Sequence, residues 1–231
     1  MTSDPNTLMQ QAACFRCLPP GMQREAQIYL LAKWANAADQ PTGSFSYSPP
    51  DATVSWNDKN GAFSGDLQTF NDQADIATVT FISLDSDGEL ASISNLSALQ
   101  ALIQLDASLN SLTSLDVSGN PALKELNCYA NSITSLNLAA NTSLVLLECG
   151  MNGMTSLLLP SSQINSIDCS QNALSVSMVN TILASLNNSG VLNGSATLND
   201  QTPAAPPSHG PPDGIAAKAA LGGKGWTVLT D

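Results

Sequence analysis

The chain between residues 102 and 174 repeats one pattern of apolar and polar positions. Each copy has two leucine-like residues three apart, an apolar residue two further on, and in most copies an asparagine three after that. From Asn110 to Asn152 the asparagines step by 10, 11, 10 and 11 residues, so two copies make one unit of 21 residues. A fixed period in this range predicts a solenoid, in which each unit is one coil.

The apolar positions predict how the coils stack. The alternation around the second leucine of each copy is typical of a short strand. One coil cannot bury its own apolar residues, so successive coils lie on one another and form a continuous column of Leu, Ile and Cys. Strands stacked in this way form a parallel sheet.

The asparagines lie at turns whose backbone groups are removed from water and need hydrogen-bond partners. A side-chain amide both donates and accepts, so a column of asparagines can join the turns of neighbouring coils. We predict two structural ladders from their spacing. The first contains Asn110, Asn131, Asn152 and Asn172, and the second contains Asn120 and Asn141.

The repeat motifs also carry a family resemblance. LTSLDVSGNPAL at residues 112–123 and LKELNCYANSI at residues 123–133 resemble the short leucine-rich repeats of bacterial and bacteriophage proteins. The resemblance implies a leucine-rich-repeat solenoid of stacked short parallel β-strands with a 21-residue repeat, flanked by an N-terminal helical unit and an α/β C-terminal cap.

The segment before the repeats predicts a separate helical unit at residues 1–40. Residues 22–38 place apolar side chains on one helix face, and such a helix must pack on something. It either caps the first coil or docks on another protein. The preceding ACFRCLPPGM, residues 13–22, resembles the start of bacteriophage virion proteins. That resemblance implies attachment through residues 1–40 to a homo- or hetero-oligomeric assembly.

The remaining boundaries follow from breaks in the pattern. Residues 41–62 are expected to be a linker with a strand at 52–56 and a turn after it, and residues 63–174 to be the solenoid, with irregular first coils. Residues 175–231 are expected to cap its open end. In that cap the sequence predicts helices at 177–186 and 214–221 and strands at 195–199 and 225–230. Similarity to the caps of phage and environmental bacterial repeats implies that the last strand pairs with the strand after the first helix.

Charge and hydropathy exclude several partners. The net charge of −12 argues against nucleic acid, which needs basic residues to neutralise phosphates. Acidic residues concentrate between Asp39 and Glu89, and the repeats look nearly neutral beside them. We expect no membrane span, because no apolar run approaches the roughly 20 residues required. The first residues lack the features of a secretory signal, which suggests assembly in the cytosol.

Candidate catalytic chemistry is sparse. Cys128, Cys149 and Cys169 share one repeat position and are expected to be small buried hydrophobes, and Cys14 and Cys17 are either two thiols or a reducible disulfide. We predict no metal and no cofactor, because the chain has one His and no glycine-rich phosphate loop. Asp106, Glu148 and Asp168 share an outer column that could suggest a glycosidase. However, a column of like charge at coil spacing is ordinary on a solvated face, so no enzyme is predicted.

A binding face is the better prediction. Its proposed residues are Lys124, Asn127, Tyr129, Val145, Leu146, Glu148, Met151 and Asp168. Four of these residues are apolar, although a solvated surface needs no apolar side chains, and such residues are typical of interfaces. Scattered exposed apolar residues are also common on surfaces that bind nothing. The sequence therefore predicts a non-enzymatic protein that binds protein or glycan. The resemblance implies a bacteriophage particle, at its tail or head surface, with other virion or cell-surface proteins, such as a receptor, as partners. The alternative is a bacterial adhesion or interaction module in the cytoplasm or at the cell surface.

Overall fold

A computed structural model describes most of the chain. The described residues are 47–48, 53–58, 61–65, 79–85, 90–93, 96–161 and 163–231. The chain divides into two compact units, Met1–Ser46 and Tyr47–Asp231, and every described residue belongs to the second. The helical unit expected at residues 1–40, with Cys14 and Cys17, therefore lies outside the described residues.

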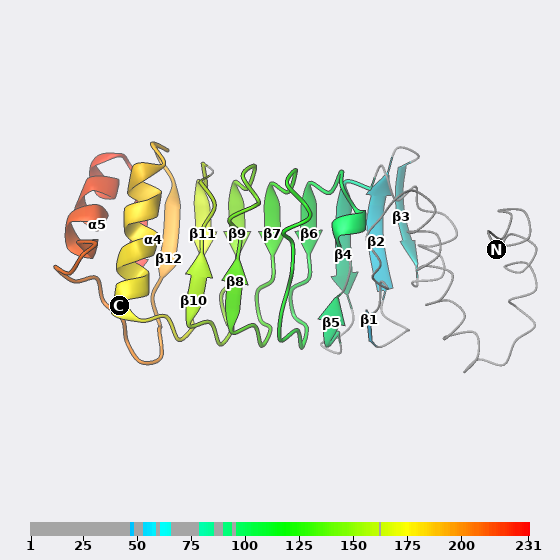
Figure 1. Cartoon of the computed structure of the whole chain (residues 1–231), viewed down its shortest axis with the longest axis horizontal. Coiled ribbons are helices and arrows are strands. Elements are labelled where there is room, and N and C mark those ends of the chain that lie inside the picture. Colours follow the sequence, from blue (N-terminus) through cyan, green and yellow to red (C-terminus); the bar gives the residue numbers. More distant parts are fainter. Residues whose placement is uncertain are drawn as a thin grey trace, which may run out of the picture. The chain divides into compact units, whose positions relative to one another are not determined.

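The second unit is built around one nine-stranded sheet with the order β13-β12-β11-β9-β7-β6-β4-β2-β3 (Figure 1). Its strands are β2 (Thr53–Asp58), β3 (Gly61–Gly65), β4 (Phe81–Asp85), β6 (Gln104–Asp106), β7 (Glu125–Asn127), β9 (Leu146–Glu148), β11 (Ser166–Asp168), β12 (Ser195–Leu198) and β13 (Thr227–Thr230). All neighbouring pairs from β4 to β13 are parallel.

Between strands of the large sheet, the chain returns through a second, smaller layer. Strands β8 (Ser135–Asn137) and β10 (Ser156–Leu158) pair in parallel there. β8 lies between β7 and β9 in the sequence, and β10 lies between β9 and β11. A short antiparallel pair, β1 (Tyr47–Ser48) with β5 (Ser92–Ile93), and the 3₁₀ helix η3 (Leu96–Ala98) precede them. This alternation between two layers, with a leucine or isoleucine at the centre of most strands, is a solenoid of the leucine-rich-repeat type.

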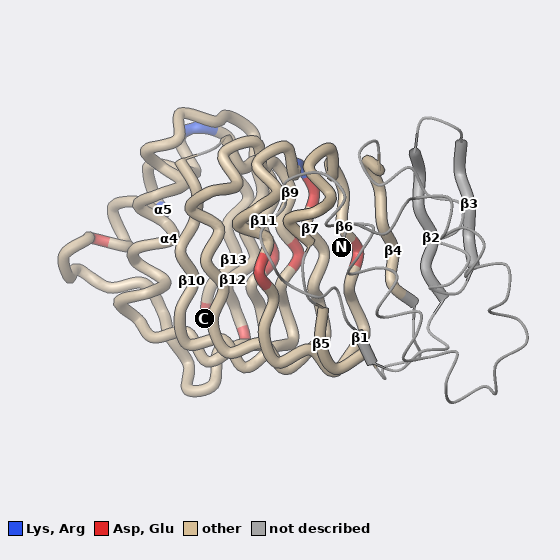
Figure 2. The backbone as a smooth tube through the Cα atoms, turned by 45° about the vertical axis from the view of Figure 1, so that its right-hand side comes forward, with Lys and Arg blue, Asp and Glu red and all other residues tan. Residues whose placement is uncertain are grey.

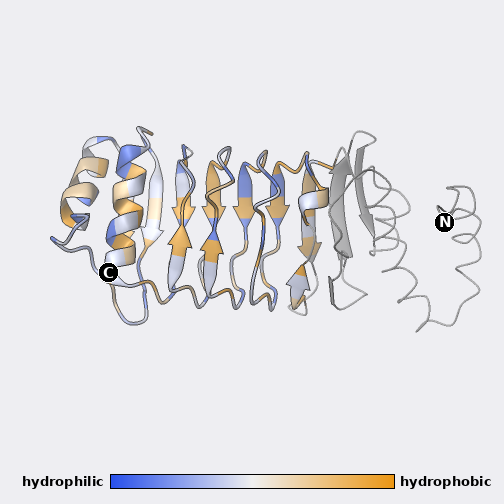
Figure 3. Cartoon of the chain, in the orientation of Figure 1, coloured by the Kyte–Doolittle hydropathy of each residue, from blue (hydrophilic) through white to orange (hydrophobic). Residues whose placement is uncertain are grey.

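The core lies between the two layers. From β4 to β12, one inward residue of each parallel strand is in register with that of the next, and all of these side chains are buried. They are Ile82, Leu105, Leu126, Leu147, Ile167 and Ala196, joined by Leu136 and Leu157 from the opposite layer. Burying each leucine stabilises the fold by about 1.5–3 kcal/mol. In Figure 3 the central strands of the sheet carry both hydrophilic and hydrophobic residues, as strands with one outward and one buried face require.

The amino-terminal edge of the sheet differs from the expectation that coils begin at residue 63. β3 is antiparallel to β2, and β2 is antiparallel to β4, with Trp56 between Phe63 and Ile82. Only two residues separate β2 from β3, and a connection this short can join antiparallel strands but cannot return the chain to a parallel one. Parallel winding therefore starts with β4 and β6.

The carboxyl-terminal cap continues the sheet and replaces the small layer with helices. Helix α4 (Val176–Asn188) follows β11, and its N-cap Ser175 accepts a hydrogen bond from Met178 N. Helix α5 (Gly214–Gly223) follows β12 and packs on α4. α4 lies beside β10 (Figure 1) and buries Val179, Ile182, Leu183 and Leu186. β13 pairs in parallel with β12, which is the pairing that the resemblance implied.

Candidate binding face

The first asparagine column joins consecutive coils. Asn131 Nδ2 donates to Ala107 O of the preceding coil at 2.9 Å and to Cys128 O of its own coil at 3.1 Å, while its Oδ1 accepts from Leu112 N at 2.9 Å. Asn110 in the preceding coil, and Asn152 and Asn172 in the two following coils, make the equivalent contacts. These residues satisfy backbone groups that the stacked turns remove from water.

The structure adds a rung to this ladder that sequence reasoning missed. Gln201 Nε2 donates to Cys169 O and Leu198 O, both at 3.0 Å, and its Oε1 accepts from Leu174 N at 3.1 Å. The signal was present in the spacing, since Gln201 follows the buried Leu198 by three residues. The position was not recognised as part of the ladder because it holds a glutamine, whose side chain is longer than that of asparagine.

The second column lies in the opposite turns. Asn120 Nδ2 donates to Leu96 O and Leu99 O, and Asn141 Nδ2 donates to Val117 O and Asn120 O. Both side chains are fully buried. Their Oδ1 atoms have no hydrogen-bond partner among the described residues.

The outward side chains of the large sheet form two rows, which we call the outer face. The first row is Gln104, Glu125, Leu146 and Ser166, and the second is Asp106, Asn127, Glu148 and Asp168. Between them lies a shallow hollow of about 210 Å³, lined by Gln104, Leu105, Asp106, Glu125, Asn127, Leu146 and Glu148. Four carboxylates thus gather on consecutive strands (Figure 2), although the repeats look nearly neutral along the sequence.

Most of the second row has a local structural role. Asp106 Oδ1 accepts from Ser108 N at 3.0 Å, Asn127 Oδ1 from Tyr129 N at 3.1 Å, and Asp168 Oδ1 from Ser170 N at 2.8 Å. Bonds from a short Asp or Asn side chain to the backbone two residues on form Asx turns. These three residues therefore shape the turn that follows each strand.

The two glutamates have no such role. Glu148 occupies the same column but has a longer side chain, and neither it nor Glu125 forms an ion pair or side-chain hydrogen bond with a described residue. Both are exposed at the hollow. Their carboxylates are therefore available to a ligand without loss of contacts within the described fold.

An apolar strip, which we call the apolar edge, runs beside the outer face. It consists of Leu109, Tyr129, Ala130 and Met151. Leu109, Ala130 and Met151 each precede a ladder asparagine and have positive φ angles of 56°, 54° and 49°. Leu109 is 66% exposed and Met151 44% exposed. Tyr129 Oη donates to Met151 Sδ at 2.7 Å, which connects two coils along the edge.

The structure separates the predicted binding residues into three groups. Asn127, Leu146, Glu148 and Asp168 lie on the outer face, and Tyr129 and Met151 lie on the apolar edge. Lys124 and Val145 precede the strands instead, where Lys124 O accepts from Val145 N at 2.8 Å. Glu125 was missing from the prediction, although the alternation around Leu126 places residues 125 and 127 on the same side.

The three described cysteines form a column inside the coils. Cys128, Cys149 and Cys169 are fully buried free thiols, and Cys149 Sγ lies 3.3 Å from Cys169 Sγ. Burial raises the pKa of the Cys128 thiol, with a smaller contribution from Cys149. Burial also raises the pKa of Cys149, followed by its hydrogen bond with Cys169. The thiols of Cys128 and Cys149 therefore stay protonated and unreactive at neutral pH.

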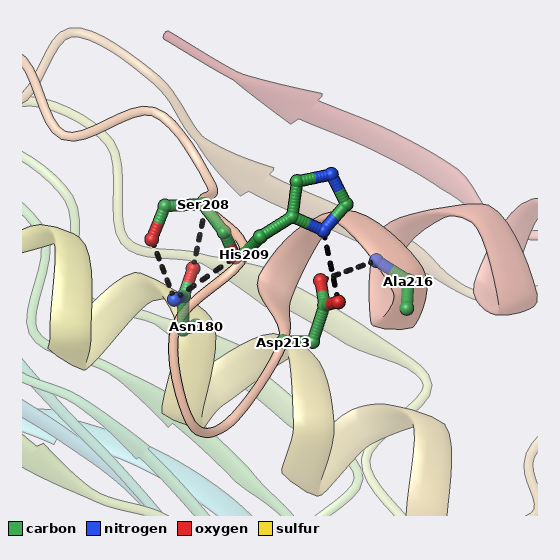
Figure 4. Close-up of polar contacts among 5 residues, drawn as sticks. All are labelled: Asn180, Ser208, His209, Asp213 and Ala216. Atoms are coloured by element: carbon green, nitrogen blue, oxygen red, sulfur yellow. Dashed lines mark hydrogen bonds and ion pairs between the residues drawn. The ribbon is translucent and has the colours of Figure 1, made fainter.

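The single histidine lies in the cap, near a serine and an aspartate (Figure 4). His209 Nδ1 lies 2.9 Å from Asp213 Oδ2, while Asp213 Oδ1 accepts from Ala216 N and so caps α5. The backbone hydrogen bond from Ala216, followed by the one with His209, lowers the pKa of Asp213. Ser208 Oγ accepts instead from Asn180 Nδ2 at 3.0 Å, on α4. The cluster fastens the loop before α5 to α4 and does not align a nucleophile with the imidazole.

The described part of the chain offers neither a metal site nor a membrane-spanning helix. No group of three or more His, Cys, Asp or Glu residues there could hold a metal ion. No helix in those same residues combines the length and hydrophobicity needed to span a bilayer.

Comparison with known proteins finds a similarity to a solved structure. No protein-family model and no curated protein matches the chain. Among solved structures, the chain is similar to the functional domain of InlJ from Listeria monocytogenes, which is described as including a cysteine ladder. The two are 31% identical with a TM-score of 0.43, and the match covers 52% of this chain and 25% of that one.

Proposed function

We propose that this protein is a non-enzymatic interaction module that binds another protein through the outer face and the apolar edge. The observation that carries the proposal is the set of exposed residues around the hollow that the fold does not use. Glu125 and Glu148 form no ion pair or side-chain hydrogen bond with a described residue, and Met151 remains 44% exposed beside Tyr129. Exposed tyrosine and aliphatic residues with a polar rim are typical of protein interfaces.

A protein ligand is favoured over a glycan by the character of the apolar residues. Leu146, Leu109 and Met151 are aliphatic, and their burial is favourable only against other apolar groups. Tyr129 supplies the one aromatic ring among the described residues of the apolar edge and the two rows. A glycan remains the second ligand class of this proposal.

A binding role is also favoured over glycoside hydrolysis. Asp106 and Asp168, two of the three carboxylates in the column that suggested this chemistry, are engaged in Asx turns. Such groups are held by their own backbone, whereas a glycosidase needs a pair of carboxylates facing one bond of the substrate.

The module is proposed to be built from a 21-residue unit of two half-turns. The register supports this, because Leu105 pairs with Leu126 and Leu126 with Leu147. One half-turn contributes a strand to the large sheet, and the other passes through the layer of β8 and β10. The unit therefore presents outer-face residues once per coil, at regular intervals along the sheet.

Residues 1–40 are proposed to attach this module to a bacteriophage particle, at its tail or head surface. The support is the resemblance of residues 13–22 to virion proteins. A bacterial adhesion or interaction module, in the cytoplasm or at the cell surface, is the alternative. Mass spectrometry of purified particles distinguishes them: the chain is expected among the virion proteins, and its absence there would reject the phage assignment.

The binding face can be tested with two matched positions. Asn127 on β7 and Asn137 on β8 are both asparagines whose Oδ1 accepts a hydrogen bond at 3.1 Å from the backbone two residues on. A photo-crosslinking amino acid is introduced at either position, in the cells that produce the chain. We expect a crosslinked protein at position 127 and none at position 137. Equal crosslinking at both, or none at 127, would refute the proposed face.

A further inference from the structure

We infer that the partner segment recognised by the outer face and apolar edge is a basic one, with lysine or arginine residues alternating with apolar residues. This inference rests on the proposed function and adds the chemistry of the partner. It is carried by the charge of the face, by the position of the apolar edge, and by the arrangement of the remaining charges.

The charge of the face has a definite sign. Between residues 102 and 174 the acidic residues are Asp106, Asp116, Glu125, Glu148 and Asp168, and the single base is Lys124. Four of the five acids lie on adjacent strands of the outer face, and Asp116 lies in the opposite half-turn. Charges gathered in this way produce a negative potential that attracts and orients a cationic partner.

The apolar edge lies next to that charge. In each coil the edge residue follows the second-row residue by three positions, as Met151 follows Glu148 and Leu109 follows Asp106. Backbone hydrogen bonds join the turns that carry the edge residues of successive coils, from Leu109 N to Tyr129 O and from Ala130 N to Gly150 O. A segment lying across the coils therefore meets carboxylates along one side and aliphatic groups along the other.

The outer face of a second copy would not match this surface, because it would place acid against acid. Two of the described bases are also engaged in the cap: Lys218 Nζ donates to Thr230 Oγ1, and Lys224 Nζ donates to Asn187 O. Nucleic acid is repelled by the same carboxylates. A basic and apolar protein segment satisfies both parts of the surface.

The test uses the full chain and three fluorescent 12-residue peptides, with alternating Lys-Leu, Lys-Ser or Glu-Leu sequences. We expect the Lys-Leu peptide to bind about tenfold more tightly than the other two, because it alone matches both the carboxylates and the edge. Binding should weaken as salt is raised, since the outer-face charges are exposed. Equal binding of the Glu-Leu peptide would overturn the charge argument, and equal binding of the Lys-Ser peptide would overturn the role of the edge.

Variants locate the binding on the molecule. Glu125→Gln with Glu148→Gln, and separately Leu109→Ser with Met151→Ser, should each weaken Lys-Leu binding about tenfold. Asp116→Asn and Leu158→Ser remove an acid and an exposed leucine from the opposite half-turns and should leave binding unchanged. An equal loss in these controls would overturn the inference. Circular dichroism melts identify any variant that fails to fold, and a Glu125→Asp, Glu148→Asp variant that keeps binding supports the role of charge.

The outcomes also separate this inference from the proposed function. If no peptide binds but the crosslinker at position 127 captures a partner, the basic segment is wrong and the interaction function stands. If crosslinking fails as well, both are wrong.

Discussion

Asp231 provides the backbone of Gln201 with the hydrogen-bond acceptor that the next coil would otherwise supply. Its Oδ2 accepts from Gln201 N at 3.2 Å, and its Oδ1 accepts from Asp200 N at 2.5 Å. In the earlier coils the equivalent groups donate to carbonyls of the following coil, as Asn131 N does to Met151 O and Ala130 N to Gly150 O. A carboxylate side chain thus closes the ladder of backbone hydrogen bonds at this rung.

Replacing Asp231 should therefore destabilise the cap. Asp231→Ala leaves the N–H groups of Asp200, Gln201 and Ala205 without this acceptor, and we expect the free energy of unfolding to fall by about 1–3 kcal/mol in urea titrations. Asp231→Asn retains one acceptor oxygen, so its free energy of unfolding should lie between those of the native protein and Asp231→Ala. The control Asp200→Asn changes an exposed residue and should shift stability by less than about 0.5 kcal/mol. An Asp231→Ala variant as stable as this control would contradict the capping role.

The asparagine rungs should contribute more than asparagines in exposed turns. Asn152→Ala removes one acceptor for Ile133 N and the donor to Cys128 O and Cys149 O, so we expect a loss of about 3 kcal/mol. Asn137→Ala removes one exposed hydrogen bond to Ala139 N and should cost about 0.5–1 kcal/mol. Chemical denaturation measures both. Equal losses would mean that joining the coils is not what Asn152 contributes.

A glycine at the apolar edge should stabilise the fold. Ala130 has a φ of 54°, a conformation that is unfavourable by roughly 1–2 kcal/mol for residues with a Cβ and accessible to glycine. We expect Ala130→Gly to raise the free energy of unfolding by about 1 kcal/mol, despite the greater freedom of glycine in the unfolded chain. Ala139→Gly, at an exposed position without a positive φ, should instead lower it. Thermal melts of the two variants moving in the same direction would disprove the argument from strain.

The cysteine column should make stability depend on alkaline pH. The pKa values of Cys128 and Cys149 are raised in the folded state, so above about pH 8.5, where an unfolded thiol ionises, the folded protein holds more protons. The free energy of unfolding then falls as pH rises, by up to about 1.4 kcal/mol per pH unit for each thiol. Below pH 8 this contribution is fully present.

Denaturation between pH 7 and 10.5 measures this dependence. The variant Cys128→Ala with Cys149→Ala should show a shallower decline, and Ala107 already occupies the same column in the first coil. If the free energy of unfolding falls equally steeply with pH in the two proteins, the thiols are not the cause. The buried thiols of Cys128, Cys149 and Cys169, followed individually by peptide mapping, should also fail to react with a thiol reagent until the chain is unfolded.

The repeating part of the fold could be predicted from the sequence, because each letter of the repeat has its own physical role. Leu126 and Leu147 have to be inside, and Asn131 and Asn152 have to satisfy turns that stacking buries. The cap helices and strands were predicted to within two residues, and the structure adds their N-caps, Ser175 and Asp213. The strand at 52–56 and the turn after it were predicted, but the antiparallel strand β3 was not, because apolar spacing alone does not distinguish such a strand from an irregular coil.

The candidate face shows the same division. The outward positions of Asn127, Leu146 and Glu148 can be predicted from the alternation along a strand. The difference in role between Glu148 and the Asx-turn residues Asp106 and Asp168 cannot. It depends on which carboxylates reach the backbone two residues on, and that requires the turn geometry.

By itself the sequence determined the solenoid, its buried columns and its cap, since these depend on spacing within one or two coils. Only the tertiary structure decided that four acids separated by about twenty residues each lie side by side, that Gln201 and Asp231 complete the ladder, and that Leu109 and Met151 border the charged rows. The physical reason is that stacking brings residues one coil apart in sequence into contact, and the potential and shape of a surface depend on such neighbours rather than on the order of residues along the chain.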